Sequence, residues 1–192
     1  MAYETYTTEA LVCGTFNRNT ADRSFLLFTK EAGMLYADAR SIREERSKQR
    51  YALQEFSLLR VSLIKGKRGW KIGSVEAMRN YYHDALDREA RGSVVNLHRL
   101  LRRFMKGEEC DVHLFEYVQS GLEVVAVAVA NRQFVEAVVA VTVLSFLGYV
   151  NKNQIPETLR GSDPIGITEH YTSKNREIIS ALYTHAIGVS HL

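Results

Sequence analysis

The sequence predicts an α+β protein, with a small five-stranded β-barrel in residues 1–78 followed by an all-α domain in residues 79–192. Short segments of alternating apolar residues fill the first part, whereas longer apolar segments with helical spacing fill the second. The charge divides at nearly the same place, because residues 1–80 carry a net charge of +5 and the remainder −2. Hydrophobic residues make up 46% of the 192, enough to bury a core in each part.

Five segments have the pattern of β-strands. They are bounded by turn residues such as Asn, Asp and Gly, and they cover Thr5–Thr15, Arg23–Thr29, Gly33–Arg40, Phe56–Lys65 and Trp70–Val75. The last two are joined by Gly-Lys-Arg-Gly, which predicts a hairpin. Five short strands in about 75 residues favour a closed barrel, because closure leaves no exposed sheet edge.

The second part has the pattern of helices. Ser93 is a candidate N-cap for a helix with Val94 and Leu97 on its apolar face, and Asp111 is a candidate N-cap for the next. Val124–Val129 is rich in β-branched residues and also fits a strand, but its flanks favour a helix.

The carboxy-terminal segments complete this helical part. Val135–Val150 is apolar on nearly all sides, which predicts a central buried helix. Asn151–Thr172 holds both prolines of the chain and is expected to be a loop, after which Ser173 is a candidate cap for a last helix.

The most informative feature for function is a basic stretch in the predicted barrel. From Asp38 to Lys71 there are ten Lys and Arg against four Asp and Glu, a local charge of +6 on a chain whose total is +3. A basic β surface is typical of nucleic-acid binding, because each cation that neutralises a phosphate releases counterions. The alternative is a solvated loop whose charges only maintain solubility, and Glu44 and Glu45 favour it because they dilute the field.

The candidate phosphate-binding residues fall into two groups. The first lies in the segment after the third strand and comprises Arg40, Arg43, Arg46, Lys48 and Arg50. The second clusters at the predicted hairpin tip and comprises Lys65, Lys67, Arg68 and Lys71.

Aromatic side chains could stack bases beside these cations. The candidates are Phe16, Tyr36, Tyr51, Phe56 and Trp70, although most aromatics of a small barrel are expected in its core. Trp70, between Gly69 and Lys71 at a hairpin edge, is the best candidate among them for an exposed ring.

Several classes of function are disfavoured. Two distant cysteines, Cys13 and Cys110, cannot form a four-cysteine zinc site and indicate reduced thiols in the cytoplasm. No segment has the length and apolarity of a membrane span, and Met1–Glu9 lacks the layout of a signal peptide. No carboxylate cluster or phosphate-binding loop is recognisable, so the expected protein is not an enzyme and uses no cofactor.

The order of motifs resembles the RecO recombination-mediator family. The resemblance is carried by Glu9–Val12, Asn19–Leu35, Ala39–Arg43 and Ser47–Leu59, with a weaker similarity at Ser145–Tyr149. It covers Thr8 to Val75 strongly and the helical part loosely. Many members of the family carry a four-cysteine zinc module after the last of these motifs, whereas Asn151–Thr172 contains no cysteine, so no zinc is expected.

The resemblance implies an OB-fold followed by a helical domain, and a non-enzymatic, cytoplasmic, nucleoid-associated protein of recombinational DNA repair. It implies binding of single- and double-stranded DNA, annealing of strands, and partnership with RecR and the single-strand binding protein in loading RecA. The basic positions matched to the family are Arg23, Lys30, Arg40, Arg43, Lys48 and Arg50. Two alternatives stay open: an OB-fold adaptor that binds protein without DNA, and an unrecognised nuclease.

Overall fold

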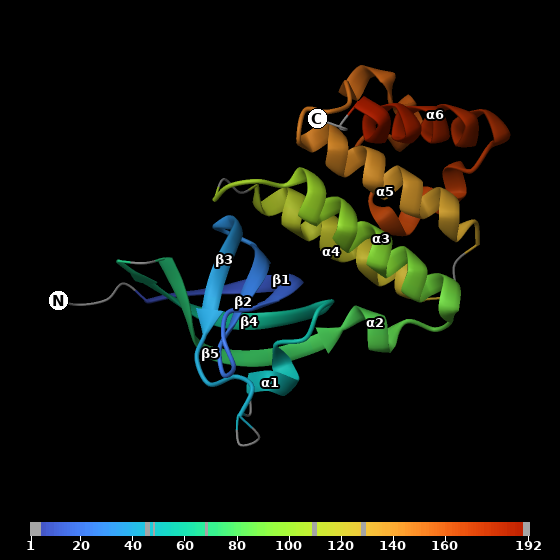
Figure 1. The fold of residues 1–192 in the computed structure, drawn as a ribbon. Coiled ribbons are helices and arrows are strands. Elements are labelled where there is room, and N and C mark those ends of the chain that lie inside the picture. The colour runs from blue at the N-terminus through green and yellow to red at the C-terminus, as the bar shows by residue number, and fades with distance from the viewer. Residues whose placement is uncertain are drawn as a thin grey trace. The chain divides into compact units, whose positions relative to one another are not determined.

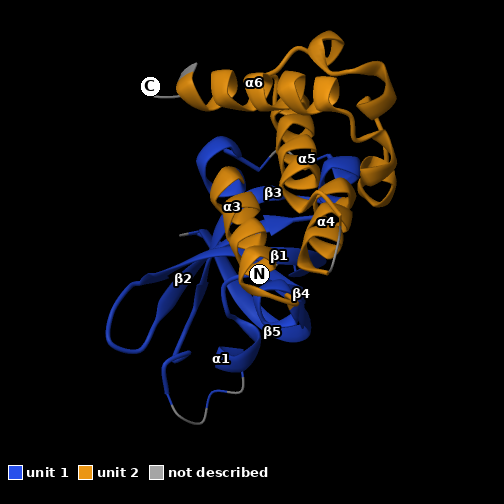
Figure 2. Ribbon diagram, turned by 90° about the vertical axis from the view of Figure 1, so that its right-hand side faces the viewer, with its two compact units in different colours: residues 1–84, 101–115 blue, residues 85–100, 116–192 orange. Residues whose placement is uncertain are grey.

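The computed structural model describes residues 5–44, 47, 49–67, 69–108, 111–127 and 130–189. These form two compact units (Figure 2): one comprises residues 1–84 and 101–115, and the other residues 85–100 and 116–192. The sequence predicted a single division between residues 78 and 79. In the structure residues 101–115, which include the last residues of one helix and the first residues of the next, group with the strands.

The first unit contains five strands, and Figure 1 shows them with the helices of the chain. They are β1 (Thr5–Asn17), β2 (Arg23–Thr29), β3 (Gly33–Ala39), β4 (Ser57–Gly66) and β5 (Gly69–Asn80). They close into a barrel in the order β1-β2-β3-β5-β4. All neighbouring pairs are antiparallel except β3 and β5, which run parallel. The predicted α+β class, with five strands followed by helices, is confirmed.

Alternation along the strands separates the inside of the barrel from its outside. In β3, Leu35, Ala37 and Ala39 are buried in the core cluster, whereas Tyr36 is exposed and Asp38 is half-buried. In β4, Leu59, Val61 and Leu63 face the core in the same way, as their alternation predicted. Each outward side chain is therefore fixed in position by two neighbours that fill the interior.

Two short helices in this unit were not predicted, α1 (Gln49–Ala52) and α2 (Tyr81–Asp84). Residues 101–115 also pack on the barrel: Phe115 contacts Phe28 with ring centroids 5.1 Å apart, and the amide of Met34 donates to the carbonyl of Gly107 at 3.0 Å. The outward side chain of Phe28 is buried as a result.

The longer helices of the described residues are α3 (Arg88–Phe104), α4 (Val112–Ala126), α5 (Arg132–Phe146) and α6 (Ser173–Val189). The last residues of α3 and the first residues of α4 belong to the first unit, and the remaining residues of both helices belong to the second. In the second unit α5 is buried from Val138 to Leu144, as its apolar sequence predicted. The predicted loop of residues 151–172 contains three short 3-10 helices, Lys152–Gln154, Glu157–Leu159 and Pro164–His170.

Two of the predicted helix caps are wrong, one by six residues and the other by one. The helix predicted from Ser93 begins at Arg88, because the carboxylate of Asp87 accepts the amide of Ala90 at 2.7 Å. The last helix is capped by Thr172, whose hydroxyl accepts the amide of Asn175 at 3.0 Å. Asp111 is confirmed as a cap, since it accepts the amide of His113 at 2.8 Å.

Helices α4 and α5 approach closely at Gly121. A Cβ at this position would lie 2.7 Å from Cγ1 of Val139, a β-branched side chain with little freedom to move. We therefore expect Gly121→Ala to destabilise the protein by about 1–3 kcal/mol, because overpacking outweighs the gain in helix propensity.

Gly92→Ala is the matched control, since Gly92 is exposed in α3 and a Cβ there would meet no atom within 4 Å. This substitution should stabilise the protein by about 1 kcal/mol. Urea denaturation of both variants measures the difference. Equal effects of the same sign would show that Gly121 does not mark a close helix contact.

Candidate nucleic-acid interface

The β1–β2 turn and the segment after β3 are hydrogen-bonded into one structure. The carboxylate of Asp22 accepts the backbone amide of Ser41 at 2.8 Å and the side-chain amide of Asn19 at 2.9 Å. The amide of Arg43 donates to the carbonyl of Ala21 at 3.2 Å, and its guanidinium donates to the carbonyl of Asn19 at 3.3 Å. These bonds hold the two segments side by side at one end of the barrel.

Asp22 is the acceptor at the centre of this structure. The pKa of the Asp22 carboxyl is lowered, mainly by the hydrogen bond from the Asn19 side chain. The hydrogen bond from the Ser41 amide and the positive charge of Arg40 lower it further. Ser41 has φ of 51°, a left-handed conformation that non-glycine residues seldom adopt without support. The carboxylate therefore stabilises a strained turn directly between two exposed arginines, Arg40 and Arg43.

Arg23 lies next to this turn. It is the first residue of β2, it pairs opposite Ala39, and its Nε donates to Oδ1 of Asn17 at 3.2 Å. Arg40 follows Ala39 directly, so Arg23, Arg40 and Arg43 lie at the same end of the barrel. We call these three residues the basic rim.

Lys71 extends the basic rim along the outside of the sheet. Register places Ser24, Asp38 and Lys71 opposite one another on β2, β3 and β5, and side chains in register point to the same face. Lys71 is exposed. Asp38 forms an ion pair with Arg18, whose Nε lies 3.1 Å from Oδ1. The acid in this row is therefore neutralised by a cation that the sequence did not single out.

The hairpin tip of β4 and β5 differs from its prediction. Trp70 is half-buried against the barrel core, and its Nε1 donates to Oε1 of Glu108 at 3.0 Å. Lys65 lies over the Trp70 ring, with Nζ 4.8 Å from the ring centroid and 3.4 Å from Oε2 of Glu108. The Trp70 bond, followed by the charge of Lys65, lowers the pKa of Glu108.

The choice of Trp70 as the best candidate for an exposed ring is therefore wrong, since Phe16, Tyr36 and Tyr51 are exposed instead. Glu108 occupies its only hydrogen-bonding group and also neutralises Lys65. Lys67, near the same tip, is exposed.

Two other predicted positions are not gathered with the basic rim. Lys30 follows β2 at the end opposite Arg23, roughly 20 Å away along an extended strand. Arg50 lies on α1, where its guanidinium is 4.8 Å from the Tyr51 ring centroid and donates to the Tyr51 hydroxyl at 2.7 Å. Arg46, Lys48 and Arg68 lie outside the described residues.

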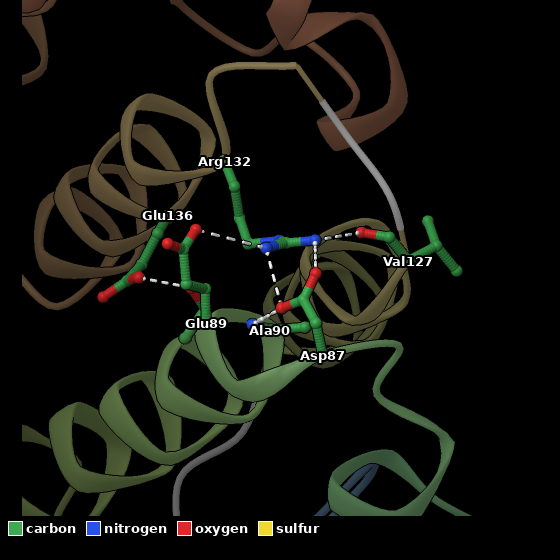
Figure 3. Close-up of polar contacts among 7 residues, drawn as sticks. Asp87, Glu89, Ala90, Val127, Arg132 and Glu136 are labelled. Atoms are coloured by element: carbon green, nitrogen blue, oxygen red, sulfur yellow. Dashed lines mark hydrogen bonds and ion pairs between the residues drawn. The ribbon is translucent and has the colours of Figure 1, made fainter.

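The second unit contains a cavity of about 380 Å³, lined by residues of α3, α5 and α6. Figure 3 shows the polar contacts beside it: Arg132, only 10% exposed, makes a two-pronged ion pair with Asp87 at 3.1 Å and lies 3.7 Å from Glu89. Glu136 accepts the hydroxyl of Ser93 at 2.6 Å. Because its one arginine is already paired with a carboxylate, this cavity does not suit a phosphate.

The described residues offer little for catalysis. Burial raises the pKa of Cys13 to about 12, so its thiol is protonated and a poor nucleophile. Among the described residues no group of three or more His, Cys, Asp or Glu is placed to hold a metal ion. In the same part of the chain no helix is both long and apolar enough to cross a bilayer.

The amino-terminal part of the chain matches a known protein family. The family described as Recombination protein O N terminal matches residues 1–81, a range that takes in all five strands of the barrel. No curated protein matches the chain. The match supports a RecO family protein, as the sequence predicted, and indicates a role in recombinational DNA repair.

The carboxylate of Asp22 gives the basic rim a pH dependence. A carboxyl whose pKa is lower in the folded state stabilises that state above its unfolded pKa of about 3.9, and the stabilisation is lost as the pH falls through the lower folded value. We therefore expect the Ser41 amide resonance to keep its hydrogen-bonded chemical shift at neutral pH and to lose it only below about pH 4.

Acid titration followed by NMR tests this, with Asp22→Asn as the control. The variant keeps an oxygen acceptor but cannot ionise, so its Ser41 resonance should show no such transition. A transition of equal size in the variant would mean that another group holds the turn.

Proposed function

We propose that this RecO-family protein binds DNA through the basic rim and Lys71, and that it acts as a non-enzymatic mediator of recombinational repair. The observation that carries the proposal is the joining of two loops by Asp22, which gathers Arg23, Arg40 and Arg43 at one end of the barrel. The match of residues 1–81 to the RecO amino-terminal family supports the same conclusion.

The proposed mechanism is electrostatic. Two complementary strands repel one another through their phosphates, and a surface that neutralises part of this charge lowers the repulsion and lets bases pair. The same contacts serve single- and double-stranded DNA, because both present a phosphate backbone. No nucleotide hydrolysis enters this mechanism.

The proposal extends to partners. We propose that the protein acts with RecR and the single-strand binding protein to help load the recombinase RecA. This part of the proposal is supported by the family match alone.

Salt dependence tests the contact between the basic rim and phosphates. We expect Arg40→Gln with Arg43→Gln to weaken binding of a fluorescent single-stranded oligonucleotide. The slope of log K against log salt should become shallower by about 1.4, since each phosphate contact to a single strand contributes about 0.7. Strand annealing, followed in the same buffers, should slow in parallel.

Lys152→Gln with Lys174→Gln is the matched control, because both lysines are exposed in the second unit and the change in net charge is the same. It should leave the slope unchanged. Equal slopes for the two double variants would reject the basic rim as the contact. Binding of protein partners without any oligonucleotide binding would instead favour the adaptor hypothesis.

A further inference from the structure

Two aromatic rings are exposed together on the outside of the barrel. Phe16, near the end of β1, is 38% exposed, and Tyr36, in the middle of β3, is 57% exposed. Their ring centroids are 5.7 Å apart with an angle of 58° between the planes. Neither ring contributes to the barrel core, so packing of that core does not explain why both are aromatic.

The register of the strands places these rings in the same region as the cations. Phe16 pairs opposite Ser24, Ser24 opposite Asp38, and Asp38 opposite Lys71, so these four residues form one row across the sheet. A second, parallel row consists of Gly14 of β1, Leu26 of β2 and Tyr36 of β3.

Residues between these two rows point inward. Phe25 and Ala37 are fully buried in the barrel core, so their neighbours along the strand face outward. The two rings, with Lys71, therefore form one outward surface.

A glycine makes room for a further cation on this surface. A Cβ at Gly14 would lie 3.3 Å from the Phe16 ring and 3.5 Å from Cζ of Arg102. Because no side chain is present there, the Arg102 guanidinium can lie over the strand, 5.8 Å from the Phe16 ring centroid. Arg102 is exposed and belongs to the same unit as the barrel.

We infer that Phe16 and Tyr36 form a stacking platform for unpaired bases and make the protein bind single-stranded DNA more tightly than duplex DNA. This inference rests on the proposed DNA binding. It adds that the protein contacts the bases of the DNA as well as its phosphates. Bases have two flat faces that stack on aromatic rings, and those faces are accessible in a single strand but covered by neighbouring pairs in a duplex. Arg102 lies beside the Phe16 ring and Lys71 lies on the same outward face of the sheet, so both can contact the phosphates that connect the stacked bases.

The charge around the rings favours a polyanion as the occupant over an apolar protein surface. Arg102 lies beside the Phe16 ring, Lys71 is on the same face of the sheet, and the half-buried Asp38 is paired with Arg18. Trp70 does not serve this role, since Glu108 and Lys65 already engage its ring.

The experiment removes the aromatic faces and, separately, the bases. Phe16→Leu with Tyr36→Leu keeps apolar side chains at both positions but leaves no flat ring. Its binding to three ligands is compared with that of the unaltered protein: a single strand, the same strand with abasic sites at every internal position, and a duplex. Tyr51→Leu is the matched control, because Tyr51 is 66% exposed but lies on α1, outside the two rows.

The unaltered protein should bind the base-bearing strand roughly 5- to 100-fold more tightly than the abasic strand, the range expected for stacking of one base. The double variant should bind both strands equally, at the affinity of the abasic strand, and its affinity for duplex should not change. The control should retain the full preference for bases.

Two further outcomes separate this inference from the proposed function. Retention of the preference for bases by the double variant, with all three ligands bound, would overturn the platform and leave the DNA-binding proposal intact. Failure of the unaltered protein to bind any of the three ligands would overturn both.

Discussion

The parallel pairing of β3 with β5 is the interaction on which the rest of the barrel unit depends. It closes the sheet, because it joins the two strands that would otherwise be its edges. Closure gives every strand one inward and one outward face, so that Ala37 and Trp70 face the core while Asp38 and Lys71 lie side by side outside. Lys71 of the β4–β5 hairpin reaches the surface that carries the aromatics of β1 and β3 only because of this pairing.

Carboxylates organise the cations of this unit in different ways. Asp22 holds two loops together without an ion pair to Arg40 or Arg43, and both of these arginines are exposed. Glu108, in contrast, pairs directly with Lys65 and fixes Trp70. The net charge of the basic stretch therefore overestimates the unpaired positive charge at the hairpin tip, because Glu108 neutralises Lys65. It underestimates the positive charge near the basic rim, because Arg18 neutralises Asp38.

The strands were predictable from the sequence because alternation and turn residues are local signals; β2 has the bounds that its apolar segment predicted. The site was predictable only in part. Arg40 and Arg43 lie within the basic stretch, but nothing local indicates that Arg102 reaches the barrel or that Glu108 covers Trp70, since both contacts join residues far apart in the chain. Ser93 was mistaken for a cap because it precedes an apolar face, whereas its hydroxyl binds Glu136 of another helix.

The location of bound DNA is best tested by NMR with an isotope-labelled protein and a short single strand. The structure predicts that amide shifts concentrate in three segments: residues 14–24, residues 36–43 and the start of β5 around Lys71. It predicts little change at Lys30, at Tyr51 or around the cavity beside Arg132. Shifts centred on Lys30 or on that cavity, with the basic rim unaffected, would contradict the assignment of the interface to this end of the barrel.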